Sequence, residues 1–214
     1  MTAPDFLPVL AAGSHLNPAA GACVMEYVSL LAGERFSDTP SCTHPVLAAM
    51  AQVVNDRLSN ADRPLLVPLI GRLFGTAETG TPLERQQLSV RLAVWCAREV
   101  LPLVRPEDQQ VCATAIDAAE TWANNPSAAN ATTAATSATS AYANANAAYA
   151  ANATTAAAAY AAAAAAAAAY AHTAFGIGFL TGLLGEYDRL TGRTDTLPHA
   201  AERAQALYAT AVAT

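Results

Sequence analysis

An alanine-rich stretch, residues 128–171, constrains the fold of this chain more than any other segment. It consists mostly of Ala, with Tyr, Thr, Ser and Asn at intervals and no charged residue. Alanine has the highest helix propensity because its side chain loses no rotamer freedom and buries no polar group. The stretch is therefore predicted to be helical, and as one unbroken helix it would be about 66 Å long at roughly 1.5 Å per residue.

The side chains of this stretch are arranged around the predicted helix in a weakly amphipathic pattern. The segment ANATTAA occurs at 129–135 and again at 151–157, an offset of 22 residues that brings both copies to the same face. We expect one tightly packed helix, or a hairpin that turns at 144–146, with small residues that let another helix approach closely. At roughly 100° per residue, one stripe carries the tyrosines Tyr142, Tyr149, Tyr160 and Tyr170, opposite most of the Thr, Ser and Asn residues.

Two other interpretations of the alanine-rich stretch stay open. The uncharged run 156–185 is long enough to cross a bilayer, but Ala is only marginally apolar and flanking arginines occur on one side only. Helices of the type I fish antifreeze proteins are also rich in Ala, with Thr at 11-residue intervals. Thr132 and Thr154 are two such intervals apart here, but Ala143 lies between them. A structural helix is favoured over both.

The rest of the chain also has helical signals and no alternating pattern typical of strands. The clearest is Thr81-Pro82-Leu83-Glu84, a capping box with proline at the first helical position. Ser127 is placed to cap the alanine-rich helix. A break in the helix is expected near Gly176–Gly178, followed by a helix that runs to Leu190 and ends at Gly192. We predict one all-α domain over 1–214, a multi-helix bundle with a helical core at 1–125, the alanine-rich helix or hairpin at 127–174 and closing helices at 176–214.

Composition restricts the partners and the compartment. The net charge is −6, and the 11 basic residues are all Arg. No basic block is present that could contact phosphates, so we expect no nucleic-acid binding. The N-terminus has no basic segment followed by a sustained apolar run, so no signal peptide is predicted and a cytoplasmic location is expected.

One group of side chains in the first 44 residues could hold a metal. Cys23 and Glu26 are three residues apart on one predicted helix, so they point the same way. Thiolate, imidazole and carboxylate groups together could supply a tetrahedral zinc site, and Glu26 could be a ligand, an orienting partner or a base for a bound water. The candidate zinc ligands are His15, Cys23, Glu26, Cys42 and His44.

The same residues have a structural interpretation. Cys23 and Cys42 could be small buried hydrophobic residues, and His44 could lie in the first turn of a helix. Glu26 could then accept hydrogen bonds from the loop 37–43. A third possibility is a disulfide between Cys23 and Cys42, paired in an oxidising compartment with one between Cys96 and Cys112. No CxxC, HExxH, nucleophile elbow or phosphate-binding loop is present to indicate a particular reaction.

The segment CVMEYVSLLAGERFSDTPSCTHPVLAAMAQVVND, at 23–56, resembles a block found in uncharacterised proteins of actinobacteria and their phages. In that group a helical N-terminal part is followed by an Ala/Tyr-rich segment and a closing piece similar to EYDRLTG, here 186–192. The resemblance implies an actinobacterial or phage setting and carries over no catalytic residue.

These observations favour a helical structural or protein-interaction protein that associates with itself or with a protein partner through the Ala/Tyr helix. A zinc-binding protein or metal-dependent enzyme using the group at 15–44 is the alternative. A membrane-associated protein is the third possibility, although membrane association is not favoured.

Overall fold

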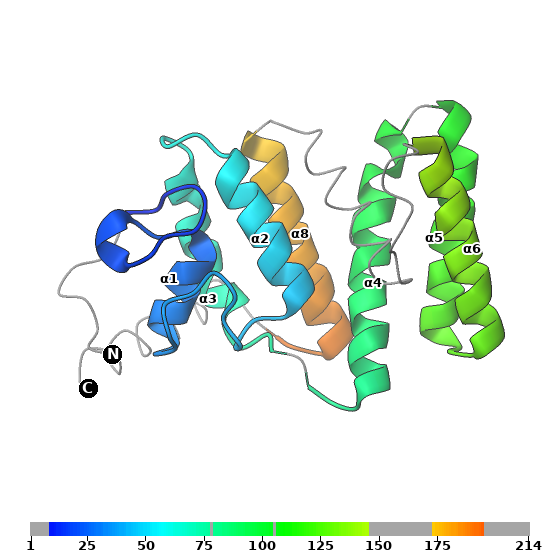
Figure 1. Cartoon of the computed structure of the whole chain (residues 1–214), viewed down its shortest axis with the longest axis horizontal. Helices are drawn as coiled ribbons and strands as arrows, with labels where there is room; N and C mark the ends of the chain where they lie inside the picture. Colours follow the sequence, from blue (N-terminus) through cyan, green and yellow to red (C-terminus); the bar gives the residue numbers. More distant parts are fainter. Residues whose placement is uncertain (1–8, 78, 105, 146–172, 195–214) are drawn as a thin grey trace. The chain divides into compact units, whose positions relative to one another are not determined.

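The predicted all-α bundle is confirmed. The computed structural model describes residues 9–77, 79–104, 106–145 and 173–194, without the side chains of 141–145 and 173–175. These residues form α-helices and short 3-10 helices with no β-strand, and a lone bridge pairs Leu10 with Ala22. The chain divides into two compact units, Met1–Glu78 with Ala167–Thr214 and Thr79–Ala166, which we describe separately (Figure 1).

The boundary between the units differs from the predicted organisation. The sequence suggested one helical core over 1–125, whereas the two units meet in sequence between Glu78 and Thr79. The two helices that follow Thr79 belong to the second unit, together with the start of the alanine-rich stretch. Sequence periodicity identifies the apolar face of a helix but not the helix that covers it.

In the residues of the first unit that the structure describes, four α-helices are present: α1 (Val24–Leu31), α2 (Pro45–Arg57), α3 (Val67–Leu73) and α8 (Thr173–Thr191). A 3-10 turn at Arg63–Leu66 leads directly into α3. Contacts run from α1 to α2, from α2 to α8, from α8 to α3 and from α3 back to α1, so the helices enclose one core. Its largest fully buried apolar side chains are Met25, Leu47, Leu66, Leu73, Leu180, Leu183 and Leu184.

Glycines end α1 and α8 in the same way. Gly33 has a φ of 67°, and the amide of Glu34 donates to the carbonyl of Ser29 at 2.9 Å. Gly192 has a φ of 70°, and the amide of Arg193 donates to the carbonyl of Asp188 at 3.0 Å. Both are Schellman endings, which need a residue that tolerates positive φ, and the prediction that Gly192 ends a helix is confirmed.

The predicted break at Gly176–Gly178 is wrong, because α8 continues through both glycines. A Cβ added at Gly176 would lie 3.3 Å from Cγ1 of Val54 on α2. Figure 1 shows α2 and α8 side by side. The glycine therefore allows two helices to approach closely, and tertiary packing outweighs the low helix propensity of the residue.

The described part of the second unit contains the α-helices α4 (Pro82–Val100), α5 (Pro106–Asn124) and α6 (Ala128–Ala145). A 3-10 turn at Leu101–Leu103 extends α4, and only residues 125–127 separate α5 from α6. The three helices share an apolar cluster of Val90, Val94, Ala97, Ile116, Ala119, Trp122, Ala123 and Ala134.

The predicted caps of this unit are confirmed. The amide of Glu84 donates to Oγ1 of Thr81 at 3.2 Å, and the Thr81 amide donates to Oε2 of Glu84 at 2.7 Å. Ser127 Oγ accepts a hydrogen bond from the amide of Asn130 at 3.1 Å, which starts α6. These local contacts fix where α4 and α6 begin.

Several predictions lie outside the described residues. They concern the tyrosine stripe, the second ANATTAA copy at 151–157, the choice between one helix and a hairpin at 144–146, and the chain beyond Thr194. The helix α6 covers the first part of the alanine-rich stretch.

Candidate functional site

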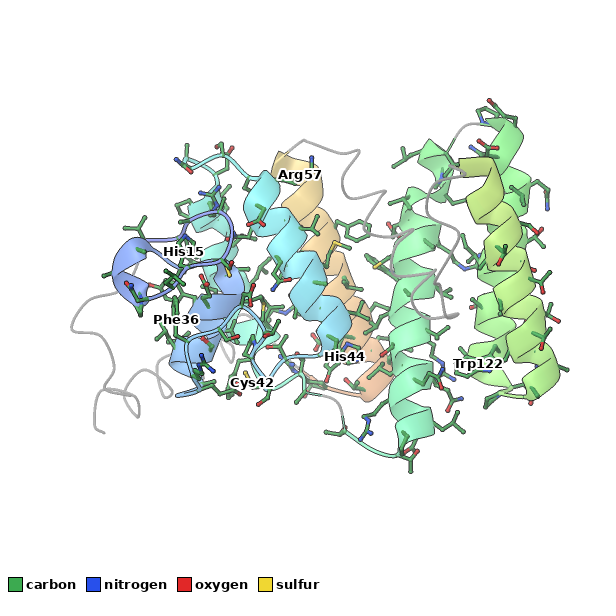
Figure 2. The ribbon with its side chains drawn as sticks, viewed as in Figure 1. His15, Phe36, Cys42, His44, Arg57 and Trp122 are labelled. Atoms are coloured by element: carbon green, nitrogen blue, oxygen red, sulfur yellow. The ribbon has the colours of Figure 1, made fainter. Side chains whose placement is uncertain are left out.

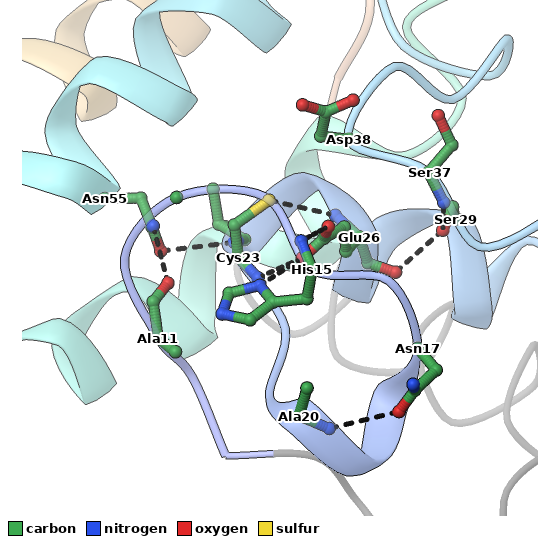
Figure 3. A network of polar contacts seen from close by, with 12 residues as sticks. Ala11, His15, Asn17, Ala20, Cys23, Glu26, Ser29, Ser37, Asp38 and Asn55 are labelled. Atoms are coloured by element: carbon green, nitrogen blue, oxygen red, sulfur yellow. Dashed lines mark hydrogen bonds and ion pairs between the residues drawn. The ribbon is translucent and has the colours of Figure 1, made fainter.

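Glu26 is the centre of a polar cluster at the start of α1. Its side chain is 1% exposed, and both carboxylate oxygens accept hydrogen bonds. Oε1 accepts the amide of His15 at 2.5 Å, and Oε2 accepts the amide of Cys23 at 2.7 Å. The ring of His15 adds a third contact, from Nδ1 to Oε2 at 2.8 Å (Figure 3). The buried charge is thus compensated entirely by N–H donors, as a buried carboxylate requires.

The contact between Cys23 and Glu26 is a capping box with cysteine in the place of Ser or Thr. Sγ of Cys23 accepts the amide of Glu26 at 3.4 Å, while Glu26 accepts the amide of Cys23. The spacing of three residues that predicted a shared helix face is therefore the spacing of a helix cap. The Ser/Thr-based capping motif does not identify this pair, because the N-cap residue is a cysteine.

The chemistry of His15 and Cys23 follows from these contacts. A carboxylate only accepts hydrogen bonds, so Nδ1 of His15 carries the proton in its contact with Glu26. Burial raises the pKa of the Cys23 thiol to about 12, and the neighbouring Glu26 carboxylate acts in the same direction. A thiol that stays protonated at neutral pH is a weak nucleophile. The contacts of Cys23 therefore serve to start the helix.

The other two predicted ligands lie elsewhere in the first unit (Figure 2). His44 is the N-cap of α2, where its Nδ1 accepts the amide of Val46 at 3.2 Å and its ring meets Tyr187 edge-on at 6.0 Å. Cys42 is half-buried, and its sulfur contacts Oγ1 of Thr43 at 3.9 Å. The placement of His44 at the start of a helix is confirmed.

The structure thus brings together His15, Cys23 and Glu26 and separates them from Cys42 and His44. Among the described residues no three His, Cys, Asp or Glu side chains are arranged to hold a metal ion. All four cysteines are free thiols, so the disulfide interpretation is wrong for this structure. Zinc binding at 15–44 stays a prediction.

Two residues that the sequence did not single out complete the cluster. Asn55 on α2 is fully buried, and its Oδ1 accepts the amide of Val24 at 3.2 Å. Its Nδ2 donates to the carbonyl of Ala11 at 2.8 Å and to Oδ1 of Asp56 at 2.9 Å. The same Asp56 oxygen accepts the amide of Gly13 at 2.7 Å. Glu26 was expected to bind the loop 37–43, but its partners come from the segment before α1.

The second candidate site is the outer face of α6. On this helix Ala134 is 1% exposed and Ala131 is partly buried, and both belong to the apolar cluster of the second unit. At 100° per residue the exposed hydroxyl residues fall within an arc of about 120° opposite Ala134. We call this arc the α6 hydroxyl face; it consists of Thr132, Thr133, Thr136, Thr139 and Ser140.

Most hydroxyl groups of this face bond the helix itself. Each donates to the carbonyl four residues earlier, at distances of 2.9–3.1 Å for Thr132, Thr133, Thr139 and Ser140. The face also has no charge, because the sequence contains no Asp, Glu, Lys or Arg from Thr121 to Gly185. Its surface therefore consists of methyl groups and of hydroxyls, most of which already donate their proton to a helix carbonyl.

None of the helices in the described ranges combines the length and the hydropathy needed to cross a membrane. Comparison of the chain with protein families, curated proteins and solved structures finds no match.

Proposed function

We propose that this chain is a helical protein-interaction protein whose contact surface is the α6 hydroxyl face, and that the first partner is a second copy of the chain. The observation that carries the proposal is the chemistry of that face. It is exposed and uncharged, and the hydroxyls of Thr132, Thr133 and Thr139 donate within their own helix.

Such a face costs little free energy to remove from water. A hydroxyl that loses its water partners without replacing them costs free energy, but here the protons stay bonded to helix carbonyls. The methyl groups of Ala and Thr supply apolar area, and their small size lets a partner helix approach closely. A surface without charge also lacks the groups that keep most protein surfaces apart.

The state of the cysteines agrees with an intracellular partner. Its four cysteines are free, and free thiols are the rule in reducing compartments. We therefore include a cytoplasmic location in the proposal. Zinc binding at residues 15–44 remains the alternative, and no ligand geometry among the described residues favours it over association.

Sedimentation velocity over a hundredfold range of concentration tests the proposal. Wild-type protein is expected to sediment faster as its concentration rises. The double variant Thr133→Arg, Thr136→Arg is expected to remain monomeric, because association would bury two guanidinium groups without partners. The matched control is Thr114→Arg on α5, which replaces an exposed threonine whose hydroxyl also bonds its own helix, to Gln110 at 2.9 Å. This control is expected to associate as the wild type does, and a monomeric wild type contradicts the proposal.

A further inference from the structure

The first unit exposes an apolar surface where the chain enters α3. Val67, at the start of that helix, is 53% exposed, and so is Leu65 in the 3-10 turn before it. The flanking Pro64 and Pro68 are exposed as well. We call these four residues the α3 apolar patch. Apolar side chains that are exposed singly are common on protein surfaces, whereas adjacent ones that form a patch indicate a contact surface.

The four residues of the patch lie on one side of the chain. Their positions have the spacing i, i+1, i+3 and i+4, which brings side chains to a single face in a helical turn. Leu66 between them is fully buried, and Leu69 and Ile70 are buried on α3. This part of the chain therefore packs one face into the core and presents a second apolar face, without any charged residue, to solvent.

The last described residues lie close to this patch. After the Schellman ending at Gly192, Arg193 donates from Nη2 to the carbonyl of Arg72 on α3 at 2.8 Å. In Figure 1 these residues, in orange, run from the end of α8 towards α3. Arg72 follows Val67 by five positions, which is about 7.5 Å along a helix axis. The four steps from Arg193 to Leu197 span up to about 14 Å, so the chain that follows can reach the patch.

The sequence beyond Thr194, outside the described residues, has an apolar face of its own. Thr196 and Pro198 are typical of a helix start. At roughly 100° per residue, the large apolar side chains of residues 197–212 fall within an arc of about 140°, and the charged Glu202 and Arg203 fall outside it. The apolar arc consists of Leu197, Leu207, Tyr208 and Val212, with alanines between them.

We propose that the α3 apolar patch is the docking site of the chain's own C-terminal segment, residues 197–212. The segment lays its apolar arc over Leu65 and Val67 and keeps its charged side chains in water. A short helix with one apolar face gains most of its stability from packing that face, and the patch supplies the surface that it needs. The contact lies within the first unit, to which both parts of the chain belong.

The tether favours this occupant over a second copy of the chain. A segment attached by a short linker meets its docking site at an effective concentration on the order of millimolar. A second copy at micromolar concentration competes poorly with it. The α3 apolar patch is therefore an intramolecular surface, distinct from the α6 hydroxyl face in the second unit.

Hydrogen exchange of the full chain, read by mass spectrometry, tests the proposal. A peptide covering residues 199–212 is followed together with a peptide from α2, which reports on the fold of the first unit. The C-terminal peptide is expected to exchange at least tenfold faster in the double variant Leu65→Glu, Val67→Glu than in the wild type, because docking would bury two carboxylates without partners. The α2 peptide is expected to exchange equally in both.

The matched control places the same charge on an exposed leucine of the second unit. Leu83 on α4 is 46% exposed. Leu83→Glu is expected to leave the exchange of the C-terminal peptide unchanged. Equal exchange of this peptide in the wild type and in the double variant would overturn the proposal.

The concentration dependence of the exchange identifies the occupant. Docking within one chain protects the C-terminal peptide to the same extent at every protein concentration. The comparison uses the Thr133→Arg, Thr136→Arg background, so that association through the α6 hydroxyl face does not contribute. Protection that rises with concentration in this background would assign the patch to a second copy and overturn the proposal.

A second measurement changes the segment and leaves the double variant aside. Val67→Cys is introduced into a chain with serine at Cys42 and Cys112, in which the remaining cysteines are buried, and its rate of reaction with a maleimide is measured. Tyr208→Glu, in the middle of the apolar arc, is expected to raise this rate about tenfold. Ala206→Glu, on the opposite face, is the control and is expected to leave the rate unchanged. Equal rates in the two variants would overturn the proposal.

Discussion

Arg72 on α3 donates a hydrogen bond from Nη2 to Oδ2 of Asp188 on α8 at 2.8 Å, across 116 positions of sequence. The two side chains are only 10% and 13% exposed. Arg193 contacts both, with Nε 3.5 Å from Oδ1 of Asp188 and Nη2 donating to the carbonyl of Arg72 at 2.8 Å. This group attaches the end of α8 to α3 and so closes the first unit.

Replacing Asp188 by Asn is expected to destabilise the first unit by about 2–4 kcal/mol, because it leaves the buried Arg72 charge without a counter-ion. Urea unfolding followed by far-ultraviolet circular dichroism measures the change. Glu186→Gln is the control, since its ion pair with the exposed Arg189 lies on the same helix and should contribute nothing measurable. Equal stability of the two variants would contradict the role of Asp188.

The glycines of α8 are expected to respond differently to alanine. A Cβ at Gly178 meets nothing within 4 Å, so Gly178→Ala should stabilise the protein by about 0.5–1 kcal/mol through helix propensity. Gly176→Ala should gain less, because its Cβ would lie 3.3 Å from Val54. Thermal unfolding of both variants checks this order. A larger gain in stability for Gly176→Ala would show that α2 moves away easily, which would contradict close packing of α2 on α8.

The buried thiol of Cys96 is expected to make the second unit sensitive to alkali. Burial raises the pKa of Cys96 to about 12, from 9.0 for an unperturbed thiol. Below pH 9 the thiol is protonated in both states, so it causes no pH dependence there. Between pH 9 and 12 the unfolded chain releases a proton that the folded chain keeps, so the free energy of unfolding falls by up to about 1.4 kcal/mol per pH unit.

Urea titrations at several pH values test this through the fluorescence of Trp95 and Trp122, which both lie in the second unit. In Cys96→Ala the free energy of unfolding should fall less steeply with rising pH, by the contribution of one thiol. This holds whatever the effect of the substitution on stability at neutral pH. Cys112→Ala is the control, because Cys112 is only partly buried. An unchanged slope for Cys96→Ala would contradict the raised pKa.

The parts of the fold that the sequence predicted are those fixed by neighbouring residues. The capping box of Thr81 and Glu84, the Ser127 cap and the glycine at 192 each depend on contacts within a few positions. The helical character of the chain follows in the same way from propensity and periodicity. The path through Gly176 was missed, because the reason for a glycine there is Val54 on another helix.

The candidate site shows the same limit. Cys23 and Glu26 were correctly placed on one helix face, and His15 was correctly grouped with them. The grouping of Cys42 and His44 with them relied on closeness in sequence, which the fold does not preserve. Asn55 and Asp56 were missed because they bind Ala11 and Gly13 across more than 40 residues, a distance that only tertiary structure bridges.

Binding of a second copy of the chain by the α6 hydroxyl face can be measured with a nitroxide spin label on that face. Thr136→Cys is labelled in a chain whose partly buried Cys42 and Cys112 are replaced by serine, with Thr114→Cys on α5 as the control site. If the face binds a second copy, the label at residue 136 becomes immobile and shows dipolar broadening as protein concentration rises, while the label at residue 114 does not. A label at residue 136 that stays mobile and magnetically isolated at every concentration would contradict it.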